Sequence, residues 1–326
     1  MYTHFDVGGP DGAHPAGGAV AGEAAAQVVG VLAESWAGRV AVRTSGIDLK
    51  TYYDKTIPDY PPGLVPFRDD PRYQALAFEE RQRVLAAAWV AYNEKTIAVE
   101  QAIVEPACHL LLRGAFAGAD TGPIKRAVAQ TLVDEQFHIL MCLEACLVAR
   151  ELHGVTALRF PEPLVVEELE GELARCASPR DAELVRLAFA TVAEVTINAY
   201  LDLLANDQTI QPMNRETTAL HRKDESSHRK LFHEFTKALF GRLTPGERAR
   251  YLRGLATGLE AFVKVDLGAW AAILDHLAVP GAPDIMQQCA RAGASKRLTR
   301  DFSGFRRLLR DAGVREEDVP FRFDAA

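Results

Sequence analysis

The stretch that decides the fold is His221-Arg222-Lys223-Asp224-Glu225-Ser226-Ser227-His228. On an α-helix, at about 100° per residue, His221, Glu225 and His228 fall within about 60° of one another. Two imidazoles and a carboxylate on one helix face are suitable ligands for first-row metals. Neither proline nor glycine occurs from Arg215 to Phe240, so the sequence predicts a helix with a metal-binding face.

The same chemistry occurs earlier in the chain, in Asp134-Glu135-Gln136-Phe137-His138. Each Asp-Glu-x-x-His follows a glutamate: 33 residues separate Glu100 from Asp134, and 29 separate Glu194 from Asp224. A single Glu-x-x-His can occur by chance. Two copies, each with a glutamate at a matched distance upstream, indicate a repeated structural unit. A four-helix bundle that holds two metals takes one Glu from each of two helices and one Glu-x-x-His from each of the others. The sequence therefore predicts an all-α fold, a ferritin-like four-helix bundle with a di-metal core and additional flanking helices.

Composition narrows the classes of partner. The chain has 326 residues, 48% of them hydrophobic, with a net charge of −7. No basic stripe indicates a nucleic acid partner, and no polybasic run or long apolar run indicates a membrane. The five cysteines show no disulfide spacing. These features are typical of a soluble cytoplasmic protein with reduced thiols.

Taken from its N-terminus onward, the sequence predicts a short tail followed by one large domain. Residues 1–18 are rich in glycine and proline and are expected to form a flexible tail rather than a signal peptide. Residues 19–326 are expected to form a single domain, with the metal-binding core at about 78–240. Helices are expected at 18–39, 78–116, 123–152, 163–175, 179–206, 215–240, 248–277, 284–292 and 299–311. Pro106 is expected to kink or divide the second of these about two turns beyond Glu100.

The doubled pattern resembles the para-aminobenzoate N-oxygenase family of ferritin-like di-iron oxygenases. The signature of that family is two copies of Glu, a spacer of about thirty residues and Asp-Glu-x-x-His, with one extra histidine a turn before the last glutamate. His221 fills the extra position, and the resemblance covers roughly Tyr92 to His233. It implies two iron ions, O₂ as co-substrate, and oxidation of an amine nitrogen to hydroxylamine, nitroso or nitro, as in antibiotic biosynthesis.

The resemblance implies seven metal ligands, four glutamates and three histidines: Glu100, Glu135, His138, Glu194, His221, Glu225 and His228. The first iron is assigned Glu100 and His138. The second is assigned Glu194, His221 and His228, and the two remaining glutamates are expected to bridge. A catalytic role is expected for His221, as an electron-rich neutral donor that tunes the reactivity of the centre.

Other residues are expected to support the ligands or the substrate. Asp134 and Asp224 could each accept the free ring N–H of the histidine on the opposite helix. Tyr92 and Asn198 share helix faces with the ligands and are candidates for substrate contacts; ordinary core packing is the alternative. Glu105 lies five residues after Glu100, about 140° around an α-helix, and is expected to point away from the site. A ligand role is not expected for His233 either.

The sequence leaves partners and rival functions open. No Gly-rich dinucleotide fingerprint or iron–sulfur cysteine cluster is present, so electrons are expected from a separate reductase or ferredoxin, or from substrate intermediates. A homodimer is expected from the resemblance alone. The rivals are C–H hydroxylation or desaturation, a ferritin-like ferroxidase or iron-binding protein, and a manganese or mixed-metal oxidase. The amine could be aryl, alkyl or bound to a carrier.

Overall fold

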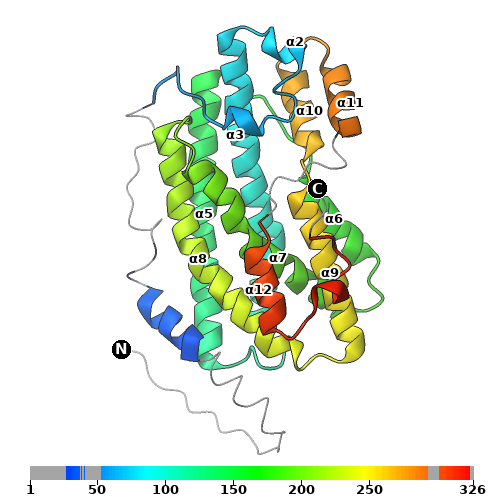
Figure 1. Cartoon of the computed structure of the whole chain (residues 1–326). Coiled ribbons are helices and arrows are strands. Elements are labelled where there is room, and N and C mark those ends of the chain that lie inside the picture. The colour runs from blue at the N-terminus through cyan, green and yellow to red at the C-terminus, as the bar shows by residue number, and fades with distance from the viewer. Residues whose placement is uncertain (1–26, 37, 39, 41–52, 293–300, 324–326) are drawn as a thin grey trace, which may run out of the picture.

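The computed structural model describes residues 27–36, 38, 40, 53–292 and 301–323 (Figure 1). Within these ranges the chain is helical and contains no β-strand, which confirms the predicted all-α class. Residues 27–36 are helical, as expected for part of the first predicted helix. The expected tail, residues 1–18, lies outside the described residues.

Four long helices form the bundle that carries the predicted ligands (Figure 1). They are α3 (Phe78–Val99), α5 (Gly122–His153), α7 (Pro179–Ala205) and α8 (Pro212–Phe240). Helix α3 packs against α5, and α7 packs against α8, so each Glu and Asp-Glu-x-x-His unit forms one helical pair. The connection between the two pairs contains α6 (Leu164–Ala174). The fold is the four-helix arrangement predicted from the doubled motif.

The flanking elements cover the bundle from several sides. Helix α9 (Pro245–Val263) packs along α7 and α6, and α12 (Ser303–Asp311) packs on α7 and α8. Helices α10 (Leu267–His276) and α11 (Ala282–Ala292) lie together near one end of the bundle (Figure 1). The remaining elements are η1 (Pro62–Leu64), α2 (Pro71–Gln74), α4 (Glu105–Leu112) and η4 (Glu316–Asp318).

Helix ends follow the local sequence signals. The hydroxyl of Ser178 accepts a hydrogen bond from the backbone N–H of Asp181, and Pro179 begins α7. Thr244 and Glu247 form a capping box at the start of α9. Gly154 ends α5 with φ 64°, a left-handed conformation that glycine adopts without steric cost.

The predicted kink at Pro106 lies earlier than expected and is a π-helical turn, η2 (Glu100–Val104). The backbone N–H of Glu105 donates to the carbonyl of Glu100, five residues back. Pro106 has no N–H, and in a regular α-helix its ring would clash with the carbonyl of residue 102. Widening the preceding turn accommodates the proline without breaking the helix. The distortion therefore begins at the predicted ligand itself.

The segment 248–277, expected to be largely helical apart from Gly254, Gly258 and Gly268, forms two helices. Helix α9 ends at Val263, and Asp266 caps the start of α10 by accepting from the backbone N–H of Gly268 and Ala269. Gly254 lies inside α9, where a Cβ atom would come within 2.8 Å of the Ala188 Cβ on α7. Its role is close helix packing rather than helix termination.

Helix α7 is long and apolar enough to cross a membrane by composition alone. Its apolar residues are mostly buried inside the bundle, however, against α8 and α9. This burial is that of a core helix in a soluble domain.

Candidate metal centre

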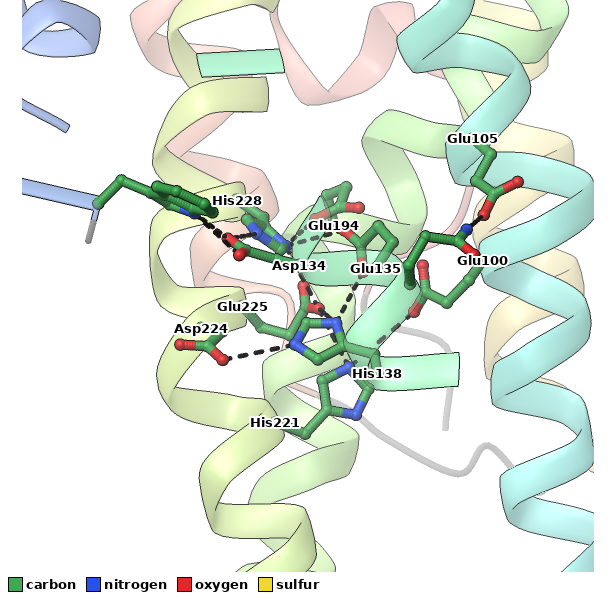
Figure 2. A network of polar contacts seen from close by, with 12 residues as sticks. Glu100, Glu105, Asp134, Glu135, His138, Glu194, His221, Asp224, Glu225 and His228 are labelled. Carbon is green, nitrogen blue, oxygen red and sulfur yellow. Dashed lines mark hydrogen bonds and ion pairs between the residues drawn. The ribbon is translucent and has the colours of Figure 1, made fainter. Parts of the chain in front are cut away.

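The seven predicted ligands converge in the interior of the bundle (Figure 2). None of the seven residues is more than 3% exposed. They come from the end of α3, from α5, from α7 and from α8: Glu100, Glu135, His138, Glu194, His221, Glu225 and His228. Their donor atoms form overlapping groups within 4.8 Å of one another, a spacing that suits metal ions.

Glu225 occupies the middle of the cluster. Its Oε1 lies 3.1 Å from His221 Nε2, 3.3 Å from His138 Nδ1 and 3.4 Å from His228 Nδ1. Glu135 is similarly central, with one oxygen 2.7 Å from His138 Nδ1 and the other 2.9 Å from His228 Nδ1. Two carboxylates that each face histidines on both sides have the geometry expected of bridging ligands.

The grouping of His221 differs from the sequence-based assignment. Its Nε2 lies 3.9 Å from Glu100, and its ring centroid is 4.1 Å from that of His138. It shares a four-residue group with Glu100, His138 and Glu225, whereas His228 lies near Glu194 at 3.9 Å. Seven residues of α-helix span about 10 Å, so His221 and His228 face opposite ends of the centre (Figure 2). In the structure His221 thus lies beside Glu100 and His138, and the iron to which it belongs remains a proposal.

Each aspartate of the two motifs lies beside the histidine of the opposite helix. Asp134 Oδ2 on α5 is 3.2 Å from His228 Nε2 on α8. Asp224 Oδ2 on α8 is 3.6 Å from His138 Nε2 on α5. These reciprocal contacts place a carboxylate behind each ring, on the side away from the bridging glutamates, where it can fix the tautomer of a metal-bound histidine.

Burial and mutual repulsion shift the titration of the cluster. Loss of water raises the pKa of Glu100 and Glu194 well above the usual range, and the charges of Glu135 and Glu225 raise both further. Burial lowers the tendency of His138 to protonate, but the neighbouring glutamates outweigh it and raise its pKa to about 9. Without a metal ion, the site therefore holds bound protons, which compensate part of the negative charge of the carboxylates.

The residues present fit a pair of metal ions. Four buried atoms of the ligand groups make no hydrogen bond: Glu100 Oε2, Glu135 Oε1, Glu194 Oε2 and His228 Nδ1. Buried polar atoms without partners are costly, and four buried carboxylates need compensating charge. Carboxylate and imidazole donors together suit iron or manganese, and the cysteines are not required.

Comparison with known proteins agrees with the fold and with the buried cluster of glutamates and histidines. Residues 22–313 match the family model described as "P-aminobenzoate N-oxygenase AurF". A 4-aminobenzoate N-oxygenase from Streptomyces thioluteus is 38% identical over 299 residues, which cover 90% of this chain and 88% of the relative. The chain belongs to the p-aminobenzoate N-oxygenase family. Membership makes it an oxygenase that acts at an amine nitrogen, and the family is one of non-haem di-iron enzymes.

Proton release should accompany metal binding in this family member. Glu100, Glu194 and His138 must lose protons before they can bind iron, and all three have raised pKa values in the metal-free protein. The affinity for Fe(II) is therefore expected to rise with pH from 6 toward about 9. Anaerobic titration in weak buffer, with a pH indicator, measures the protons released. Binding that is independent of pH and releases no protons would contradict this expectation.

Both predicted substrate contacts carry an unsatisfied polar atom. Tyr92 Oη and Asn198 Nδ2 are buried and have no hydrogen-bond partner. Tyr92 lines two cavities beside α3, a larger one of about 440 Å³ and a smaller one of about 40 Å³. An unpaired hydroxyl on a cavity wall is available to a ligand, so a substrate role for Tyr92 remains a supported prediction.

Sequence reasoning missed three contributors to the site region. Lys95 and Tyr200 line both cavities, and Trp36 hydrogen-bonds to Asp134. Lys95 lies on the same helix one turn from Tyr92, so the helical period could have found it. The contact of Trp36 spans 98 residues of sequence and has no local signal.

The residues excluded as ligands lie where they were expected. Glu105 is directed away from the cluster (Figure 2) and accepts a hydrogen bond from Gln136. His233 Nε2 lies 2.9 Å from Asp311 on α12. Neither residue belongs to the groups that could hold a metal.

Proposed function

We propose that the chain binds two iron ions at the buried cluster and uses O₂ to oxidise the nitrogen of an aromatic amine that carries an anionic group. The observation that supports the metal centre is the set of four buried ligand atoms that make no hydrogen bond, on three carboxylates and one imidazole. We propose all seven predicted ligands as iron ligands, with Glu135 and Glu225 as bridges. His221 then joins Glu100 and His138 at one iron, and His228 joins Glu194 at the other.

The anionic group is inferred from Lys95. Lys95 is the only basic side chain among the described residues that line either cavity, and its ammonium group has no hydrogen bond or ion pair with another described residue. Loss of water lowers its pKa, although the charge of Asp266 acts in the opposite direction. Asp266 accepts hydrogen bonds from the backbone of α6 and α10. A carboxylate on the substrate would supply Lys95 with a partner of its own.

Aromatic side chains define the rest of the larger cavity. Its walls include Tyr60, Tyr92, Phe160, Tyr200 and Trp270. These aromatic walls suit a ring, and Lys95 suits one anionic substituent on it. Three carboxylates also line this cavity, those of Glu94, Glu162 and Asp266, so the substituent has to lie on the Lys95 side. The relative named 4-aminobenzoate N-oxygenase indicates the first compound to test, since 4-aminobenzoate has an aromatic ring, an amine and a carboxylate.

The protein contributes position and protection to the reaction. Iron bound at the cluster would supply the oxidant from O₂. Lys95 would hold the anionic end of the substrate, and Tyr92 would offer a hydroxyl to its polar groups, whereas Asn198 lines neither cavity. Val99, Phe262 and Val263 line the smaller cavity and would exclude water from a substrate bound there. In the first oxidation one N–H bond would be replaced by an N–O bond, and the hydrogen would end on the inserted oxygen, which gives the hydroxylamine.

The remaining partners are proposals that follow from this chemistry. Reduction of the iron between turnovers needs an electron donor, for which we propose a separate reductase or ferredoxin. A cytoplasmic location and a homodimer are consistent with the soluble helical domain and the family, and each remains a prediction.

A single-turnover reaction tests the function. The apo-protein is loaded with Fe(II) without oxygen, the iron per chain is counted, and O₂ is added with 4-aminobenzoate, aniline, benzoate or hexylamine. The expected result is two irons and an oxygenated nitrogen on 4-aminobenzoate. Rapid formation of a ferric mineral that is indifferent to every amine would favour a ferroxidase. Oxygenation of carbon alone would favour the hydroxylase reading.

Lys95→Met is expected to weaken binding of 4-aminobenzoate by about 10- to 100-fold, because a charge-assisted hydrogen bond is lost. Turnover of aniline, which has no carboxylate, should change little. Steady-state kinetics with both amines measure the difference, and Lys95→Arg serves as the control that keeps the charge. Equal losses with both amines would show that Lys95 does not recognise the anionic group.

A further inference from the structure

A tryptophan from the N-terminal part of the chain reaches the metal centre. The Nε1–H of Trp36 donates to Asp134, with the nitrogen 2.8 Å from Oδ1 and 3.1 Å from Oδ2. Asp134 is 2% exposed, and its Oδ2 lies 3.2 Å from His228 Nε2. An indole, a carboxylate and an imidazole therefore form one hydrogen-bonded chain that ends at a predicted ligand.

The hydrogen bonds from Trp36 through Asp134 determine which nitrogen of His228 can bind a metal. The other ring nitrogen, Nδ1, faces the cluster, at 2.9 Å from Glu135, 3.4 Å from Glu225 and 3.9 Å from Glu194. If Nε2 carries the proton and donates it to Asp134, the lone pair of Nδ1 points inward, where a metal ligand must present it. Asp134 can hold this arrangement only if its own carboxylate is fixed.

We infer that Trp36 is a positioning residue for the metal centre, which it acts on through Asp134 and His228. By donating to Asp134, the indole fixes the carboxylate in the orientation that holds the His228 ring and its tautomer. The helix at residues 27–36 is then part of the catalytic structure, although it lies outside the four-helix bundle. This inference rests on the proposed metal centre.

The same helix has a second, independent anchor on α5. Gln130 Nε2 donates to the carbonyl of Ala33 at 3.0 Å, and the side chains of Val29 and Ala33 are buried in the core. Removal of the indole N–H should therefore leave the helix in place. Gln130→Ala is the matched control. It weakens the attachment of the helix but leaves intact the hydrogen bonds that link Trp36, Asp134 and His228.

The test compares Trp36→Phe with Gln130→Ala by anaerobic titration with Co(II), whose absorption bands report its coordination. Wild type is expected to bind two ions per chain. Trp36→Phe is expected to lower the affinity of one of them by about 10- to 100-fold and to alter its absorption bands, as loss of an outer hydrogen bond does in metal sites. Gln130→Ala should bind both ions as wild type does.

A double-mutant cycle shows whether Trp36 acts through Asp134. The affinity of Asp134→Ala and of the Trp36→Phe/Asp134→Ala double variant should be equal, because the tryptophan has no effect once the carboxylate is gone. Additive losses would overturn the inference, as would wild-type affinity in Trp36→Phe or equal losses in Trp36→Phe and Gln130→Ala. If wild type itself fails to bind two ions, the proposed metal centre fails first, so the two failures are distinct.

Discussion

Glu225→Ala is expected to reduce bound iron from two ions per chain to one or none and to abolish N-oxygenation. Glu225 lies within 3.4 Å of all three histidines of the cluster and belongs to both groups that contain His138. If Glu225 bridges the two irons as proposed, its removal would deprive both of a shared oxygen ligand and would leave the histidines without the carboxylate that faces them. A defect at one end of the centre would therefore extend to the other.

Iron content after anaerobic loading and product formed per chain measure this effect. Glu216→Ala is a suitable control, since Glu216 is an exposed glutamate on the same helix. Thermal unfolding of the apo-proteins would separate loss of metal from loss of fold. A Glu225→Ala protein that keeps two irons and normal turnover would refute the bridging role.

His221→Ala is expected to keep much of its iron but to lower productive oxygenation by about 100-fold. The burial of His221 and the nearby charge of His138 lower its pKa, so its imidazole is neutral at pH 7 and can act as a nitrogen donor. Glu100, His138 and Glu225 remain to hold the iron at that end. The loss should thus appear in the reaction rather than in the metal count.

Single-turnover product yield and O₂ consumption, measured on protein with known iron content, test this expectation. His233→Ala is the matched control, because His233 lies on the same helix and pairs with Asp311 away from the cluster. Unchanged turnover of His221→Ala would show that the third histidine is dispensable. Loss of both irons would show that it is a structural ligand instead.

Local sequence determined the fold class and the candidate ligands. Helical periodicity places residues at i, i+4 and i+7 on one face, so His221, Glu225 and His228 had to share a stripe once the helix formed. The matched spacing of Glu100 and Glu194 from the two motifs then required two helical pairs. The helix starts at Ser178 and Thr244 were predictable too, because capping depends on neighbouring residues alone.

Tertiary structure decided how these parts combine. The ends of the centre at which His221 and His228 lie depend on the packing of α8 against α5 and α7, and the periodicity of one helix carries no information about that packing. The π-helical turn at Glu100 arises because Pro106 must be accommodated within a packed helix. The indole of Trp36 reaches Asp134 across 98 residues. Residue spacing determined which side chains could bind metal, whereas packing between distant segments determined which of them meet, because such contacts leave no period in the sequence.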